Sequence, residues 1–189
     1  MKIHLTLLGL LSLASSVPLS AAAQREESVL IFENRRVAVA VPPGFSFASS
    51  QDEAGLINLN LADSGNKVSL HVVFVPDPEE RATQARARKE KMVELFKGFV
   101  ASSVEQAMRF EELDPRRGAG TYCVFTDAGL VGRPSFPPGE YLHLTAGVKA
   151  WQGVIGVFRL FSNDTTSAEY LAMLKLLRGS VEERPVPLR

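Results

Sequence analysis

Histidine is the side chain most often used for acid–base catalysis and for metal binding, and His71 and His143 are the two that follow the amino-terminal segment. Both lie in segments whose apolar residues alternate or cluster as in β-strands. A zinc site needs several ligands at fixed distances, and the chain has no Cys-x-x-Cys or His-Glu-x-x-His motif. A metal site would therefore require both histidines to meet across a sheet beside Asp127 or Glu140. The sequence predicts no metal and no cofactor.

Motifs for nucleophilic catalysis and nucleotide binding are also missing from the sequence. Neither Ser135 nor Ser162 lies in a Gly-x-Ser-x-Gly frame. The segment Gly118-Ala-Gly120 lacks the third glycine and the following helix of a dinucleotide-binding loop. Catalytic groups can come from distant parts of a chain, so a hydrolase stays open as the alternative function. Its candidate residues are His71, Asp127, Tyr141, His143 and Arg159.

The first candidate contact surface is residues 129–139, a segment rich in glycine and proline that joins two predicted strands and contains Arg133 and Phe136. It is longer than a tight hairpin connection, and long loops on a rigid sheet often carry binding residues. Trp151, beside a predicted turn, is a further candidate. Arg133, Phe136 and Trp151 are therefore the predicted binding residues, although either aromatic could instead pack at the edge of the core.

Basic residues are concentrated between Arg81 and Lys91, where glutamates flank or interrupt them. Opposite charges at helical spacing favour a solvated helix face held by ion pairs. Because helical spacing makes Arg81, Arg88 and Lys91 near neighbours, a contact with an acidic partner is the alternative.

The amino terminus predicts export. Residues 1–23 have a basic start, an apolar run from Leu5 to Leu13 and a small-residue end, the layout of a signal peptide cleaved after Ala23. The apolar run is roughly half the length that a membrane-spanning helix needs, so we expect no integral membrane anchor in the mature form. The expected location is the periplasm if the source is a Gram-negative bacterium, and otherwise outside the cell.

Composition limits the class of partner. The chain carries 21 basic and 21 acidic residues, and this balance argues against nucleic acid as a partner. Cys123, the one cysteine, has no partner within its own chain, so the fold must depend on its apolar core. We expect Cys123 to be a buried hydrophobe, with a reactive thiol as the alternative. We expect residues 24–184 to form one monomeric domain followed by a tail, residues 185–189.

Segments rich in β-branched and aromatic residues between turn residues predict an antiparallel sheet of about seven strands. They are Ser28–Glu33, Arg36–Val41, Gly55–Leu61, Lys67–Val75, Gly120–Thr126, Glu140–Trp151 and Gly153–Phe161. In the strand that contains Val68 to Val75 both faces are partly apolar, so each face needs cover from the protein or from a partner.

Two helices are available as cover for the sheet. The first is predicted to follow Asp77 as cap, with Pro78 and Glu80 in its first turn, and to run to about Ala101. Its buried stripe would contain Met92, Phe96 and Phe99, widened by Val93 and Val100. The second would begin with a capping box of Thr166 and Glu169 and end at Gly179. Its buried line would be Leu171, Leu174, Leu177 and Val181.

This order of strands and helices resembles that of the PsbP-like group, which includes photosystem II extrinsic proteins and bacterial exported relatives of the DcrB type. The resemblance rests on three segments: Val41-Pro-Pro-Gly-Phe45, the stretch from Tyr141 through the Trp151-Gln-Gly153 turn, and Tyr170–Val181. The resemblance implies an α+β sandwich and carries over no catalytic residue. The favoured function is a non-catalytic envelope or secreted module that binds a protein or a small apolar ligand.

Overall fold

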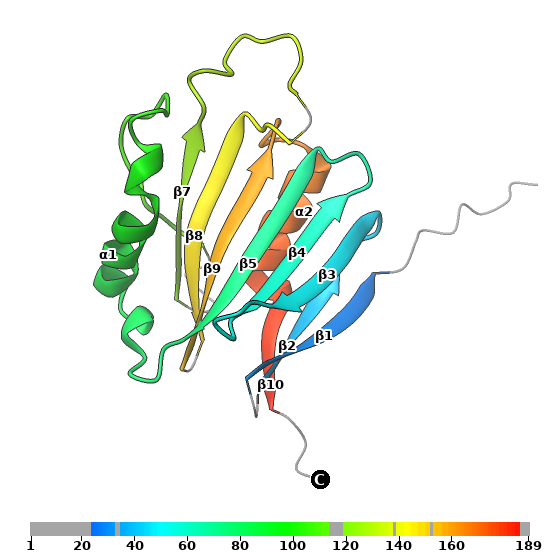
Figure 1. Cartoon of the computed structure of the whole chain (residues 1–189), viewed down its shortest axis with the longest axis vertical. Helices are drawn as coiled ribbons and strands as arrows, with labels where there is room; N and C mark the ends of the chain where they lie inside the picture. The colour runs from blue at the N-terminus through cyan, green and yellow to red at the C-terminus, as the bar shows by residue number, and fades with distance from the viewer. Residues whose placement is uncertain (1–23, 33–34, 114–118, 138, 152, 186–189) are drawn as a thin grey trace, which may run out of the picture.

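The structure, a computed structural model, describes residues 24–32, 35–113, 119–137, 139–151 and 153–185. Its centre is an antiparallel sheet of seven strands in the order β3-β4-β5-β9-β8-β7-β6 (Figure 1). The strands are β3 (Phe45–Gln51), β4 (Ile57–Asp63), β5 (Val68–Pro76), β6 (Glu111–Glu112), β7 (Gly120–Thr126), β8 (His143–Trp151) and β9 (Val154–Ser162). The predicted α+β class with a mainly antiparallel sheet is confirmed. The predicted signal peptide, residues 1–23, lies outside the described residues.

A second, three-stranded sheet contains β1 (Arg25–Phe32), β2 (Arg35–Val41) and β10 (Val181–Pro185). The sequence had placed the first two of these strands in the same sheet as the rest and had missed both β3 and β10. It missed β3 because this strand alternates two phenylalanines with serine and alanine. The predicted tail from residue 185 needs one correction, since Pro185 pairs with Arg35 in β2.

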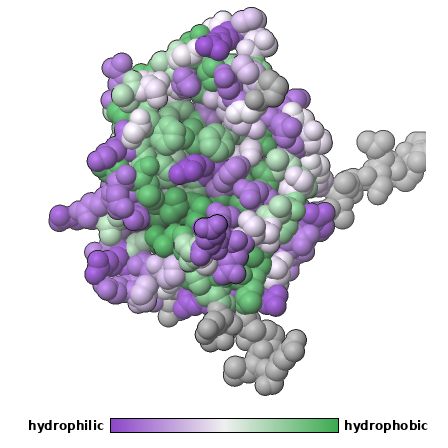
Figure 2. Space-filling view, in the orientation of Figure 1, coloured by the Kyte–Doolittle hydropathy of each residue, from purple (hydrophilic) through white to green (hydrophobic). Residues whose placement is uncertain are grey.

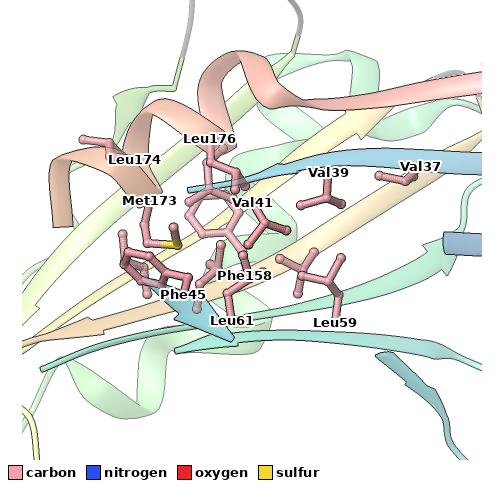
Figure 3. Packing of buried hydrophobic residues seen from close by; sticks show 14 of the residues in the cluster. Val37, Val39, Val41, Phe45, Leu59, Leu61, Phe158, Met173, Leu174 and Leu176 are labelled. Carbon is pink, nitrogen blue, oxygen red and sulfur yellow. The ribbon is translucent and has the colours of Figure 1, made fainter. Parts of the chain in front are cut away.

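One face of the large sheet carries the larger apolar core. The small sheet and helix α2 (Ala168–Lys175), which continues into a π-helical turn (Leu176–Ser180), pack there in a single apolar core (Figure 3). Alternate residues of the strands point into this core, as the period of two in a β-strand requires. The side chains labelled in Figure 3 are Val37, Val39, Val41, Phe45, Leu59, Leu61, Phe158, Met173, Leu174 and Leu176.

The opposite face is only partly covered. Helix α1 (Ala85–Phe96) packs on β7 and β8, where Met92 and Phe96 are buried against Cys123 and Ala146. Figure 1 shows no helix in front of β3, β4 and β5. Within the described residues, no helix combines the length and the apolar character needed to cross a membrane.

Helix α1 begins later than predicted. The Asp77 carboxylate accepts hydrogen bonds from the backbone N–H groups of Arg81 (3.2 Å) and Ala82 (2.9 Å), so Asp77 does cap a turn. That turn is a separate 3₁₀ helix (Arg81–Thr83), because Glu80 adopts a left-handed conformation with φ 52° instead of entering an α-helix. The predicted extension to Ala101 is also wrong, since a 3₁₀ turn (Lys97–Phe99) follows α1 and leaves Phe99 exposed.

Helix α2 differs from its prediction by its cap and its buried stripe. Ser167, and not Thr166, is the N-cap, because its hydroxyl accepts the backbone N–H of Tyr170 at 3.2 Å. Leu174 and Leu177 are buried as predicted, whereas Leu171 is 51% exposed. The buried stripe passes through Tyr170 and Met173 instead.

Arg88 is a buried structural residue, which corrects the predicted solvated basic face. It is 4% exposed, and its Nε donates to the Thr121 hydroxyl at 2.9 Å. Its Nη1 donates to the carbonyls of Ala82 (3.1 Å) and Thr83 (2.8 Å), and its Nη2 lies 3.2 Å from the Glu112 carboxylate. The guanidinium therefore ties the start of α1 to β7 and does not share an exposed side with its basic neighbours.

Cys123 is buried, as the sequence predicted. Burial, with a smaller contribution from the charge of Glu105, raises the pKa of its thiol to about 12. The thiol lies 3.8 Å from the Ala146 carbonyl oxygen, to which it donates. Since thiolate is the reactive form, these contacts favour a space-filling role over a reactive one.

Candidate functional site

The uncovered part of the large sheet presents a regular grid of side chains. Directly paired residues of an antiparallel sheet point to the same face, and the register pairs Asn60 with His71 and His71 with Arg159. Parallel rows lie above and below this one. We call the surface the open face; it consists of Asn58, Asn60, Ala62, Ser69, His71, Val73, Val157, Arg159 and Phe161, with Ser46, Ala48 and Ser50 along the β3 edge. Figure 2, which views this side, shows apolar surface that hydrophilic residues interrupt.

A cavity of about 160 Å³ lies at one end of the open face, where α1 and its following turns meet the sheet. Its base is a row of register partners, Phe125, Leu144 and Phe161, from three neighbouring strands. Two ring contacts line it, Phe99 with Phe125 (5.9 Å between centroids) and Tyr141 with Phe161 (5.5 Å). We call this space the aromatic cavity; its remaining lining residues are Ser102, Ser103, Asp127, Gly139 and Leu142.

Backbone hydrogen bonds hold the walls of the aromatic cavity in place. The Val104 N–H donates to the Thr126 carbonyl at 2.8 Å, which fixes the segment after α1 against the end of β7. The Asp127 N–H donates to the Leu142 carbonyl at 2.8 Å, which closes the base of the long loop before β8. These two hydrogen bonds fix the ends of segments that bound the cavity, and such preformed walls favour a ligand site.

A second, polar pocket of about 280 Å³ occupies the middle of the open face. Its lining residues are Ser50, Asn58, Asn60, His71, Val72, Val73, Val157 and Arg159, with no carboxylate among them. The His71 ring makes an edge contact with Phe161, centroid to centroid 5.7 Å, and its Nε2 lies 3.1 Å from the Ser69 hydroxyl. Phe161 therefore links the polar pocket to the aromatic cavity.

The three predicted binding residues do not form one site. Arg133 and Phe136 lie in the loop beside the aromatic cavity, and neither lines it. Arg133 lies 3.9 Å from the Glu140 carboxylate, and Phe136 is half-buried. Trp151 is the last residue of β8, about 25 Å along the strand from its first residue, His143, at the end near the loop. Its ring packs on the covered core, with its centroid 5.8 Å from that of the Phe74 ring. The alternative interpretation of Trp151 as an aromatic at the core edge fits this position.

The two histidines lie on opposite faces of the sheet. His71 is on the open face, whereas His143 pairs with Ser162 and points to the side of α2. The His143 Nδ1 lies 3.1 Å from the Thr126 hydroxyl, which in turn donates to Glu105 at 2.8 Å. The proposed metal set is therefore not assembled. Among the described residues, no group of three or more His, Cys, Asp and Glu side chains could hold a metal ion.

The candidate hydrolase residues are also dispersed. His71 and Arg159 are neighbours on the open face, and Asp127 and Tyr141 line the aromatic cavity. His143 is separated from these four by the sheet itself. A nucleophile, a base and an orienting carboxylate are thus not brought together as acyl transfer requires.

Folding favours the neutral form of both histidines. Burial lowers the pKa of His71 from 6.5, and the charge of Arg159 adds to this effect. Burial also lowers the pKa of His143, against smaller opposite effects of Glu105 and Asp164. Below pH 6.5 the unfolded chain therefore binds more protons than the folded one, and stability falls as pH falls through that window.

We accordingly expect the melting temperature to be lower at about pH 5.5 than at about pH 7.5. The double variant His71→Gln/His143→Gln should show a smaller difference between these two pH values, measured by thermal unfolding. An undiminished difference in the variant would assign the effect to other groups.

The sequence contained part of the signal for this site. The period of two in β9 places Val157, Arg159 and Phe161 on one side of the strand. No sequence pattern indicated that Phe99 and Ser102 would line the aromatic cavity, because their position depends on how the chain turns back after α1. No family model, curated protein or solved structure matches this chain, so the resemblance to the PsbP-like group stays a prediction.

Proposed function

We propose that the protein is an exported, non-catalytic binding module whose open face holds a small ligand with an apolar part. The observation that carries this proposal is the open face itself, half of a sheet left uncovered beside a preformed aromatic cavity. Valines and Phe161 on this face are only half-buried, although side chains of this kind gain free energy when removed from water. Export rests on the amino-terminal sequence.

The volume of the aromatic cavity limits the apolar part of the ligand. A cavity of about 160 Å³ is close to the roughly 150 Å³ that accommodates a benzene-sized molecule. An aromatic ring or a short alkyl chain therefore fits, and each buried methylene would contribute about 0.8 kcal/mol. A flat protein surface would leave a hollow of this volume unfilled, which favours a small ligand over a protein.

Binding is favoured over catalysis by the arrangement of polar groups. The open face places one imidazole beside one guanidinium, and no carboxylate orients that imidazole. The Nε2 of His71 is engaged by the Ser69 hydroxyl, within its own strand. Such a set can hold a ligand by hydrogen bonds but lacks an activated nucleophile.

A neutral fluorescent probe tests this function directly. N-phenyl-1-naphthylamine, whose phenyl ring can enter the cavity while its naphthyl ring lies on the open face, should gain fluorescence on binding. Ser102→Trp, which places an indole at the exposed rim of the cavity, should abolish most of that gain. Leu171→Trp is the matched control, because Leu171 is exposed on α2, on the opposite side of the sheet. No gain with the wild-type protein, or an equal gain with Ser102→Trp, would refute the proposed site.

A further inference from the structure

Arg159 is an exposed cation at the centre of the open face, and nothing so far accounts for it. It forms no ion pair with any residue that the structure describes. Its guanidinium carbon lies 6.0 Å from the centroid of the Phe96 ring, and its partners across the strands are His71 and Ala146. A positive charge therefore stands beside two aromatic side chains, and no carboxylate of the described residues is paired with it.

The groups around Arg159 are suited to an anion. Asn58, Asn60 and Ser50 add amide and hydroxyl groups to the polar pocket, and the grid of the open face contains no acidic residue. Guanidinium binds carboxylate through two parallel N–H···O bonds, a geometry that lysine cannot supply. Its contact with Phe96 restricts the side chain before a ligand arrives, which reduces the entropy lost on binding.

The charged and apolar parts of the site are close together. Phe161 is two residues beyond Arg159 on the same side of β9, a separation of roughly 6.6 Å along the strand. Phe161 also lines the aromatic cavity, while its ring contacts that of His71. One molecule of moderate length can therefore reach from the guanidinium into the cavity.

We propose that the ligand is an amphiphilic monoanion, whose carboxylate binds Arg159 in the polar pocket and whose apolar part enters the aromatic cavity. This inference rests on the proposed binding function and adds the chemical class of the ligand. Charge complementarity selects a single negative charge, since one guanidinium is the only formal charge among the residues of the open face. A cationic or doubly charged head group would be poorly matched.

Isothermal titration calorimetry of the mature protein at about pH 7.5 tests apolar binding and carboxylate recognition separately. The probes are octanoate, 1-octanol and octylammonium. Octanoate should bind at least roughly tenfold more tightly than 1-octanol, a difference of about 1.4 kcal/mol, because its carboxylate can form a charge-assisted hydrogen-bonded pair with Arg159. Octylammonium should bind more weakly than either. Arg159→Gln should remove the preference for octanoate and leave 1-octanol binding unchanged.

Arg133→Gln is the matched control, because Arg133 is also exposed but lies outside both pockets and beside Glu140. It should keep the full preference for octanoate. Equal affinities of wild-type protein for octanoate and 1-octanol would overturn the anion inference and leave the binding function standing. A preference that survives Arg159→Gln, or that is lost in Arg133→Gln, would also overturn it. Failure of all three probes together with the neutral fluorescent probe would instead refute the binding function.

Discussion

Replacing Arg88 by methionine is expected to lower the free energy of unfolding by about 2–4 kcal/mol, because several buried acceptors lose their donor. Methionine fills much of the same volume but cannot donate to the carbonyls of Ala82 and Thr83 or to the Thr121 hydroxyl. These acceptors would be left in a region from which the guanidinium, 4% exposed, now excludes water. Buried polar atoms that lose their partners pay the full cost of desolvation.

Arg86→Met is the matched control for this prediction. Arg86 is on the same helix, its side chain is 90% exposed, and its partner is Glu90 one turn away. An exposed pair of this kind contributes at most about 0.5 kcal/mol. Urea denaturation of both variants should therefore shift the midpoint strongly for Arg88→Met and barely for Arg86→Met. Equal midpoints for the two variants would show that Arg88 does not hold α1 to β7.

Replacing Gly147 by alanine should cost about 2–3 kcal/mol, although it adds a single methyl group. A Cβ at this position would lie 2.6 Å from the Thr121 carbonyl oxygen and would also collide with the ring of Phe158. The carbonyl belongs to the backbone of β7, which is paired with β8, and Phe158 is fully buried. Neither neighbour can move without disturbing the sheet or the core.

Gly98→Ala provides the comparison for Gly147. Apart from its chain neighbours and the adjoining helix backbone, no atom of the described residues lies within 4 Å of the position of its Cβ. Because its backbone is also helical, alanine should be neutral or stabilising by up to about 1 kcal/mol. Thermal and urea unfolding of both variants would measure the difference. A Gly147→Ala variant as stable as Gly98→Ala would mean that β7, β8 and Phe158 are not packed as described.

The parts of the fold that could be predicted are those with a strong local signal. The segment from Gly120 to Thr126 was predicted with its observed bounds, because five of its seven residues are β-branched or aromatic. The missed strand β10 had a competing signal, since Val181 continues the helical spacing of Leu174 and Leu177. Val181 is in a strand because it pairs with Val39, which is far away in the sequence.

The burial of Arg88 illustrates why the remaining features could not be predicted. Its local sequence is typical of a solvated helix. The Thr121 hydroxyl that accepts its hydrogen bond lies in β7, 33 residues further along the chain. The open face has the same limitation. His71 and Arg159 become neighbours only because β5 pairs with β9, and that strand order is not written in either segment. Alternation in the sequence predicts which residues of a strand share a face of the sheet. Which residues of other strands lie beside them depends on the order in which the strands pair.

The central claim is that a small ligand occupies the open face, and mapping backbone amide chemical shifts during an octanoate titration tests it most directly. We predict that the largest changes fall on His71, Arg159 and Phe161 and on Leu144 at the base of the aromatic cavity. The small sheet, represented by Val37 and Val39, should remain unchanged because it lies behind the large sheet. Changes confined to the small sheet, or no changes with octanoate and with the neutral fluorescent probe alike, would contradict the claim.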